Sequence, residues 1–169
     1  GANWTLIKDF NDSSKIWDAA YSTGYWFVFR VKAGGGSNAE KVSRAPIADW
    51  TSWTSTADTN MGAAAKDFNA ATSTASSDHA TIVIVNSDDL ARSTDSGATF
   101  VRTVNALPYG SARAVASDGQ GNWVATHDSG KVSYSNDDGQ TWSVGSSGVT
   151  FDSGTEDIDS VAVNKYLPL

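Results

Sequence analysis

The side chains best suited to chemistry in this chain are carboxylates gathered in two short turns. One octet reads "SNDDGQTW" and an earlier one reads "STDSGATF", so aspartate, serine and threonine oxygens lie close together in each. A carboxylate pair can hydrolyse glycosides, and clustered oxygen ligands can hold calcium. The same residue types also form turns in which a carboxylate accepts hydrogen bonds from nearby backbone N–H groups. We expect the turn role, because no spacing singles out a catalytic pair or a calcium loop.

The other residues that commonly carry chemistry are scarce. His79 and His127 are the only histidines, and cysteine is absent. Both histidines lie at turn-like positions, so we expect surface residues or turn hydrogen bonds rather than a general base or a zinc ligand. The lack of cysteine removes disulfides and thiolate chemistry and leaves the redox compartment undetermined. The sequence therefore predicts no catalytic residue, no metal and no cofactor.

Composition narrows the class of protein further. The 169 residues are 40% apolar and 18% charged, which suits one compact domain, and Ser, Thr, Gly, Asn and Asp outnumber the strong helix formers. A net charge of -7 would repel nucleic acid. The longest apolar runs are too short to span a bilayer, so no membrane insertion is expected. These features favour a β protein that binds neither nucleic acid nor the membrane interior.

The strands that must position the two octets recur along the sequence with a period of about 42 residues. Turn residues divide the segment around the later octet into four short strands, at residues 112–117, 122–127, 131–135 and 141–144. Upstream, residues 80–85 and 90–93 repeat part of this pattern, and Thr141-Trp142 follows Thr99-Phe100 by 42 residues. A degenerate third copy, "KVSRAPIADWTSW", lacks the glycine. The spacing predicts one β-repeat domain over 1–169, with units at about 9–53, 54–100 and 101–142 and a split unit from 1–8 plus 143–169.

The two octets resemble the Asp-box, Ser-x-Asp-x-Gly-x-Thr-Trp, also called the BNR repeat of sialidase-like β-propellers. The resemblance implies an all-β fold of repeated four-stranded antiparallel blades, here a small or partial propeller with a split terminal blade. It also implies that the motif lies between the third and fourth strands of a blade, away from the central ligand funnel. The residues expected to form these structural turns are Ser93, Asp95, Gly97, Thr99, Phe100, Ser135, Asp137, Gly139, Thr141 and Trp142.

Sialidase-like hydrolysis is the activity that the resemblance suggests first. Such enzymes use three arginines to hold a carboxylate, a tyrosine activated by a glutamate, and an aspartate as acid. "FRVK" at residues 29–32 lacks the proline of the family's Phe/Tyr-Arg-Ile-Pro motif, and neither Glu40 nor Glu156 lies beside a tyrosine in the sequence. The five arginines are scattered along the chain. We therefore expect a protein that is not an enzyme.

Aromatic residues are the remaining candidates for ligand contact. Most aromatic side chains in a β-repeat are core, but seven tryptophans exceed what a modest core needs. In the segment from Tyr25 to Lys32, alternation places Tyr25, Phe27 and Phe29 on one face and Trp26, Val28 and Arg30 on the other, as in a sheet packed between neighbours. The candidate ligand contacts, with a glycan as one ligand, are Trp17, Tyr21, Trp50 and Tyr109.

These observations predict a recognition or structural module without catalysis. Three units and a split fourth leave three arrangements open: a closed four-blade ring, an open stack, or blades completed by partner chains. Because an unpaired sheet edge invites association, we expect a homo-oligomer or a larger protein assembly. The composition resembles bacteriophage virion proteins, such as a tail fibre, spike or capsid decoration protein, and predicts a virion-surface or extracellular location. The alternatives are a secreted glycan-binding lectin, a degenerate sialidase-like enzyme, and a propeller-type assembly factor.

Overall fold

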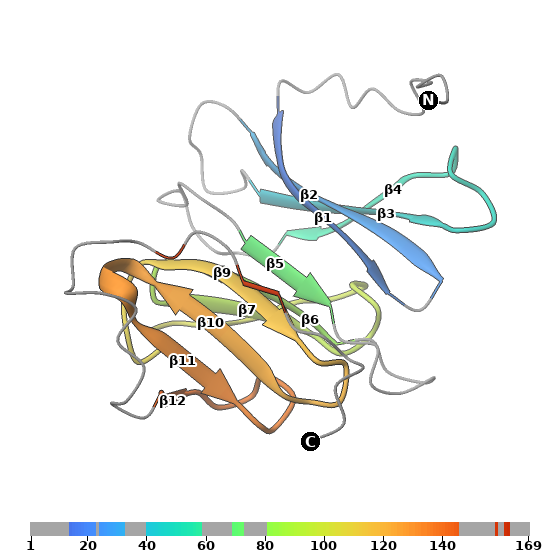
Figure 1. The fold of residues 1–169 in the computed structure, drawn as a ribbon. Coiled ribbons are helices and arrows are strands. Elements are labelled where there is room, and N and C mark those ends of the chain that lie inside the picture. Colours follow the sequence, from blue (N-terminus) through green and yellow to red (C-terminus); the bar gives the residue numbers. More distant parts are fainter. Residues whose placement is uncertain are drawn as a thin grey trace, which may run out of the picture.

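The protein folds into three four-stranded antiparallel sheets that follow one another along the chain (Figure 1). The computed structural model describes residues 14–22, 24–32, 40–58, 69–72, 81–145, 158 and 161–162. The first sheet contains β1 (Ser14–Ser22), β2 (Tyr25–Lys32), β3 (Glu40–Pro46) and β4 (Thr54–Asp58). The second contains β5 (Asn69–Thr72), β6 (Ile82–Asn86), β7 (Asp89–Ser93) and β8 (Val101–Thr103). The third contains β9 (Ala112–Ser117), β10 (Trp123–His127), β11 (Val132–Ser135) and β12 (Ser143–Val144).

Each sheet is a meander in which the strands pair in sequence order. The first strands of the sheets lie toward one another: β5 contacts both β1 and β9, so the second sheet lies between the other two. A short 3₁₀ turn, Asp128–Gly130, links β10 to β11. Within the part of the chain that is described, no helix has the length and hydropathy needed to cross a membrane. The prediction of repeated four-stranded antiparallel units is confirmed.

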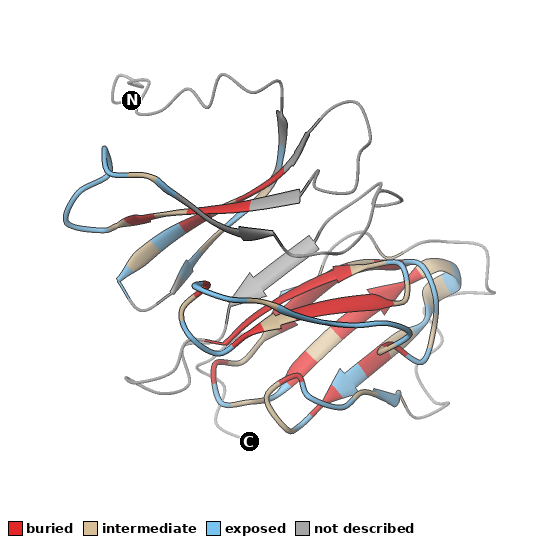
Figure 2. Ribbon diagram, turned by 180° about the vertical axis from the view of Figure 1, so that it is seen from behind, coloured by how far each residue is buried: buried red, intermediate tan, exposed pale blue. Residues whose placement is uncertain are grey.

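Two hydrophobic clusters hold the sheets face to face, and both depend on alternation along β6. Ile82 and Ile84 point toward the first sheet and pack with Phe27 and Phe29. Val83 and Val85 point the other way and pack in a cluster with Trp123 and Ala125 of the third sheet. Figure 2 shows the buried residues concentrated in the middle strands of the sheets. Because β6 is buried on both faces, its sequence is a continuous apolar run rather than an alternating one.

The sheets do not share the boundaries of the predicted units. Strands β4, β8 and β12 begin directly after residues 53, 100 and 142, yet each pairs with the strand before it. Boundaries placed at those residues therefore cut each sheet before its last strand. The reason is that the repeated motif forms the turn between the third and fourth strands, so it does not mark the end of a sheet.

The split fourth unit lies largely outside the described residues. None of residues 1–8 is described, and of 143–169 only 143–145, 158, 161 and 162 are. The hydroxyl of Thr126 on β10 donates a hydrogen bond to the carbonyl oxygen of Ile158 over 2.8 Å. The chain after the third sheet therefore returns to β10 at Ile158.

Candidate functional site

The later octet forms a turn that satisfies its own polar groups. Asp137 Oδ1 accepts hydrogen bonds from the Thr141 N–H over 2.9 Å and from the Ser135 hydroxyl over 2.8 Å. Its other oxygen, Oδ2, accepts one from the Thr141 hydroxyl over 2.6 Å. The Ser135 hydroxyl in turn accepts from the Gly139 N–H over 3.0 Å. The side chain of Asp137 thus spans the turn and links its two arms.

The earlier octet repeats this network atom for atom. Asp95 accepts from the Thr99 N–H over 2.9 Å, from the Thr99 hydroxyl over 2.6 Å and from the Ser93 hydroxyl over 2.8 Å. The Gly97 N–H donates to the Ser93 hydroxyl over 2.9 Å. Two turns 42 residues apart therefore share one geometry, as their shared sequence pattern predicts.

The hydrogen bonds keep both motif aspartates ionised. Burial opposes ionisation of Asp137, but the bonds from Thr141 and Ser135 outweigh it and lower its pKa to about 2. In the same way, burial acts against the bonds that Asp95 receives from Thr99 and Ser93, and the pKa of Asp95 falls below its ordinary value. A catalytic acid needs the opposite shift, toward neutral pH. These carboxylates are suited to accepting hydrogen bonds and not to donating protons.

Each motif glycine lies against the preceding sheet. A Cβ atom at Gly97 would lie 2.7 Å from Phe27 Cε1 of the first sheet, and one at Gly139 would lie 2.9 Å from Val83 Cγ2 of the second. Both glycines also have positive φ, +73° and +77°. The position therefore requires glycine for two reasons, the left-handed backbone and the close contact between sheets.

An arginine of the preceding sheet fixes each turn in place. Arg44 Nη1 on β3 donates to the Ser96 carbonyl oxygen over 2.5 Å, and Arg92 Nε on β7 donates to the Asp138 carbonyl oxygen over 2.7 Å. Ser96 and Asp138 are the residues directly before the two motif glycines. The side chain of Asp138 adds an ion pair to Arg92 at 3.1 Å and accepts a hydrogen bond from the Thr81 hydroxyl.

The sequence of one turn alone does not show that Asp138 contacts the preceding sheet. In the stretch "NDDG", Asp137 bonds within its own turn, whereas Asp138 bonds to the neighbouring sheet. Arg44 and Arg92 were also not predicted as partners of the turns. Comparison of the repeats could have suggested these arginines, because they occupy equivalent positions. Arg44 pairs across the first sheet with Phe27, which contacts Gly97, and Arg92 pairs across the second sheet with Val83, which contacts Gly139.

The degenerate copy of the motif in the first sheet also contains an aspartate, Asp49, but its hydrogen-bond donors lie two and three residues after it. Asp49 accepts from the Thr51 N–H over 3.0 Å, from the Thr51 hydroxyl over 2.6 Å and from the Ser52 hydroxyl. The Ser52 bond is the main cause of a pKa lowered to about 2, and the Thr51 bonds add to it. Trp50 projects from the same turn and is 53% exposed.

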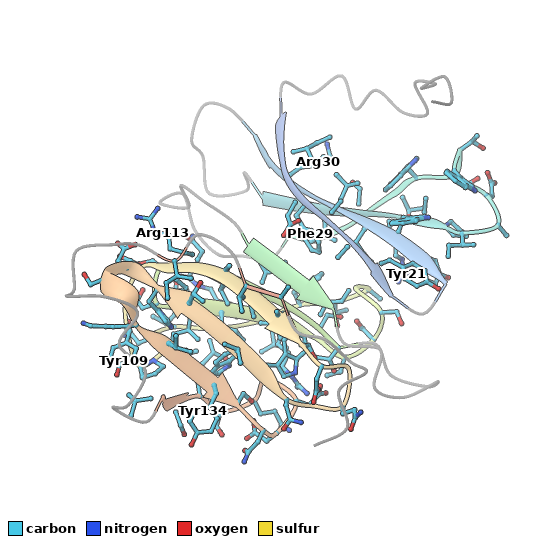
Figure 3. The ribbon with its side chains drawn as sticks, viewed as in Figure 1. Tyr21, Phe29, Arg30, Tyr109, Arg113 and Tyr134 are labelled. Atoms are coloured by element: carbon cyan, nitrogen blue, oxygen red, sulfur yellow. The ribbon has the colours of Figure 1, made fainter. Side chains whose placement is uncertain are left out.

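The candidate ligand contacts that the structure describes belong to two sheets, Tyr21 and Trp50 to the first and Tyr109 to the third. Tyr21, near the end of β1, is 44% exposed (Figure 3). It pairs across the first sheet with Trp26, which is 40% exposed, and their ring centroids are 5.4 Å apart. Trp26 was not among the candidates. The side chain of Trp17 lies outside what the structure describes. Tyr109 is half-buried on the third sheet, where its ring meets His127 edge-on at 5.5 Å and Lys131 Nζ at 5.1 Å.

His127 is fully buried, so the expectation of a surface residue is wrong for this histidine. It ends β10, and its ring lies within hydrogen-bonding distance of the Ser133 hydroxyl, 2.8 Å, and the Gly110 carbonyl oxygen, 3.3 Å. Burial is the largest effect and lowers its pKa. Ser133 is also fully buried, so this Ser–His pair is part of the packed interior. His79 lies outside the described residues.

Across the described ranges, no group of three or more His, Cys, Asp or Glu side chains could hold a metal ion. Asp89, the first residue of β7, is buried and pairs with Arg102. The site that emerges is therefore a surface rather than a pocket. It consists of the Tyr21–Trp26 pair on the outer face of the first sheet.

Comparison with solved structures shows a partial β-propeller fold. The chain superposes on YCF48 bound to D1 peptide with a TM-score of 0.55, at 17% identity over 79% of this chain and 40% of that one. It superposes on YCF48 from Cyanidioschyzon merolae with a TM-score of 0.59, at 19% identity over 85% and 40% of the two chains. A GH74 xyloglucanase from Xanthomonas campestris gives 0.52, at 17% identity over 79% and 21%.

The chain thus spans about two fifths of the length of the YCF48 proteins it superposes on. No family model matches the sequence, and no curated protein matches it. At these identities the similarity establishes the propeller-like fold alone.

Proposed function

We propose that this protein is a non-enzymatic structural and recognition module that binds a protein partner through the outer face of its first sheet. The observation that carries the proposal is the position of Trp26. Trp26 pairs with Ala45, Ile82 pairs with Ser93, and Trp123 pairs with Ser135, so the three residues are equivalent in the repeat. Ile82 and Trp123 are buried against the preceding sheet, whereas Trp26 is 40% exposed.

An exposed aromatic side chain can bind a partner when the equivalent residues of the other repeats are buried in the core. Tyr21 lies beside Trp26 and is also partly exposed, and Ile47 lies next to the same hairpin through its N–H bond to the Gly24 carbonyl oxygen, 2.8 Å. Tryptophan and tyrosine supply much of the binding energy at protein interfaces, because they bury large rigid areas. Ala45, the cross-strand partner of Trp26, is already buried, so a partner need cover only the Tyr21–Trp26 end of this face to bury both rings.

The fold comparison supports a protein ligand. One of the similar solved structures is YCF48 with a D1 peptide bound, so a propeller of this kind can hold a peptide. For this chain, a role as an assembly factor or as a virion-surface component is a proposal. The second of these rests on composition alone.

Glycan binding is a second candidate, supported by Trp50. Its ring is exposed in a polar turn, next to the ionised Asp49. An exposed tryptophan beside a carboxylate can stack on a sugar ring while the carboxylate accepts hydrogen bonds from hydroxyl groups. This surface differs from the Tyr21–Trp26 pair, so variants can separate the two ligands.

Two observations support the absence of catalysis. The five arginines lie on three different sheets and each has a polar partner; Arg113, for example, pairs with Asp128. They do not converge as a carboxylate clamp would. The Ser133–His127 pair is buried away from any substrate.

Binding measurements on matched variants test the proposal. The protein should bind members of a peptide array, and a Tyr21→Ala/Trp26→Ala variant should bind them at least about tenfold more weakly, as expected for loss of interface aromatics. Val101→Ala, which removes a side chain 69% exposed on β8, is the control and should bind normally. Binding to a glycan array that is lost with Trp50→Ala would favour the second candidate. Equal peptide binding by all variants would contradict the protein-binding surface.

A further inference from the structure

We propose that the partner segment at the Tyr21–Trp26 pair is a proline-rich stretch in the polyproline II conformation, with a lysine or arginine that reaches Asp49. This inference rests on the proposed function, because it names the class of protein segment that covers this surface. It depends on three features of the first sheet: the paired backbone beneath the rings, the rings themselves, and the carboxylate of Asp49.

The strand that carries Trp26 is paired on both sides. β2 pairs with β1 and with β3, and Trp26 lies opposite Tyr21 on one side and Ala45 on the other. A ligand that adds a strand to a sheet needs an edge with unpaired N–H and C=O groups. A segment that binds over Trp26 therefore binds through its side chains. Polyproline II meets this condition, because its backbone makes no internal hydrogen bonds and stays hydrated.

The rings of Tyr21 and Trp26 form an apolar surface suited to proline. Their planes are inclined by 53° and their centroids are 5.4 Å apart, so the rings touch and a ligand lies across them rather than between them. Ile47, 39% exposed, extends this surface beside the hairpin, where its N–H bonds to the Gly24 carbonyl oxygen. Proline-rich segments dock on aromatic-lined surfaces and lose little conformational entropy, because their φ angles are already fixed.

A fixed negative charge lies one turn away from the rings. Tyr25, next to Trp26, pairs with Pro46, whose carbonyl oxygen accepts a hydrogen bond from the Asp49 N–H over 3.0 Å. Asp49 is exposed, and a hydrogen bond from Ser52 is the largest cause of its pKa being lowered to about 2. A polyproline II segment advances about 3.1 Å per residue, so roughly four residues extend from the rings to this turn.

This carboxylate favours a basic ligand. Arg44, the cation on the neighbouring strand, lies over the Tyr25 ring at 4.9 Å and donates a hydrogen bond to the Ser96 carbonyl oxygen of the second sheet. Its charge is thus engaged on the face toward that sheet. The net charge of the whole chain, -7, adds to the attraction for a cation. A lysine or arginine beside the prolines therefore complements Asp49.

Three synthetic peptides of equal length, titrated against the full chain, test this assignment. The first is a run of prolines with one arginine, the second has glutamate in place of the arginine, and the third has alanines in place of the prolines. Fluorescence anisotropy of the labelled peptides measures each affinity. The arginine peptide should bind at least about tenfold more tightly than either of the others. Added salt should reduce its advantage over the glutamate peptide.

Matched variants locate the binding surface. Tyr21→Ala/Trp26→Ala should bind the arginine peptide at least about tenfold more weakly, whereas Trp26→Phe keeps an aromatic face and should retain most of the affinity. Asp49→Asn should remove the preference for arginine over glutamate and keep the preference for proline over alanine. Asp118→Asn is the control, because Asp118 accepts hydrogen bonds within a turn of the third sheet, and it should bind normally. Thermal melting confirms that each variant is folded.

Equal affinity for the proline and alanine peptides would overturn the inference, and so would a preference for arginine that survives Asp49→Asn. These two results come from the peptides and a surface variant, so they stand even if the double alanine variant does not fold. If binding to array peptides is still weakened in Tyr21→Ala/Trp26→Ala, the proposed function remains and only this ligand class is wrong. If that variant is folded and binds every peptide normally, the proposed function is contradicted as well.

Discussion

The side chain of Arg92 on β7 donates a hydrogen bond to the backbone carbonyl oxygen of Asp138, 2.7 Å away in the turn of the next sheet. Arg44 makes the equivalent bond to Ser96, one sheet earlier. The repeat therefore extends beyond the strands and turns to the contacts between sheets. Each turn motif is both the corner of its own sheet and the part of that sheet that docks on the previous one.

Loss of the arginine should weaken this docking. Arg92→Ala leaves the Asp138 carbonyl oxygen without its charged donor in a partly buried site, so we expect the free energy of unfolding to fall by about 1 to 3 kcal/mol. Arg113→Ala is the matched control, since Arg113 and its partly buried partner Asp128 belong to the same sheet and no contact between sheets is lost; the pair should contribute below about 1 kcal/mol. Urea unfolding followed by tryptophan fluorescence measures both. An equal decrease in the free energy of unfolding for the two variants would mean that the contact between sheets does not stabilise the protein.

Removing the motif carboxylate should destabilise the turn without affecting an active centre. Asp137→Ala deletes the acceptor for the Thr141 N–H and hydroxyl, which should cost about 1 to 2 kcal/mol. Asn136→Ala changes an exposed residue of the same turn and should be nearly neutral. Thermal melting compares the two. An unchanged melting temperature together with lost ligand binding would instead identify Asp137 as a binding residue.

Acid should remove the contribution of the low-pKa aspartates. The pKa of Asp137 falls from 3.8 to about 2 on folding, and that of Asp49 falls similarly. The stabilisation that follows is complete above about pH 4 and is lost as the pH falls toward 2, because the unfolded chain binds the proton first. Asp137→Asn should flatten stability between pH 4 and 2. A variant with the same acid dependence as the unmodified protein would count against the shift.

The buried histidine should make stability depend on pH in a second range. His127 remains neutral in the folded protein because burial lowers its pKa, whereas the unfolded chain takes up a proton near pH 6.5. Stability should therefore fall as the pH drops below about 6.5. Guanidinium unfolding from pH 7.5 to 5 should show this slope, and His127→Gln should reduce it. His79→Gln is the control for the other histidine, and a slope that depends on His79 alone would refute the assignment.

The sequence predicted local structure best where turn residues marked the ends of strands. Residues 112–117 form β9 as expected, because the glycine-rich turn after them fixes where the strand ends. In contrast, β5 has the sequence Asn-Ala-Ala-Thr and lacks the alternation that identifies a strand. It forms because β6 offers it a pairing edge. That pairing is tertiary and has no local signal.

The candidate surface was harder to predict than the fold. Tyr21 could be nominated from sequence, but whether Trp26 is core or exposed depends on which sheet precedes its own. Trp123 is buried and Trp26 is exposed although the repeat makes them equivalent. The strand predicted at 122–127 ends at His127, as β10 does. The turn that follows it, Asp128–Gly130, suggested a position at the surface, whereas the ring of His127 lies in the interior.

The most direct test of turn docking compares two glycine variants by chemical denaturation. In Gly139→Ala, the new methyl group would meet Val83 at 2.9 Å in a backbone with φ +77°, whereas a Cβ at Gly110 meets nothing within 4 Å. Gly139→Ala should lose about 2 kcal/mol or more, because strained φ and overpacking add. Gly110→Ala should stay within about 0.5 kcal/mol of the unmodified protein. Equal stability of the two variants would contradict the account that the motif glycine docks each sheet on the one before it.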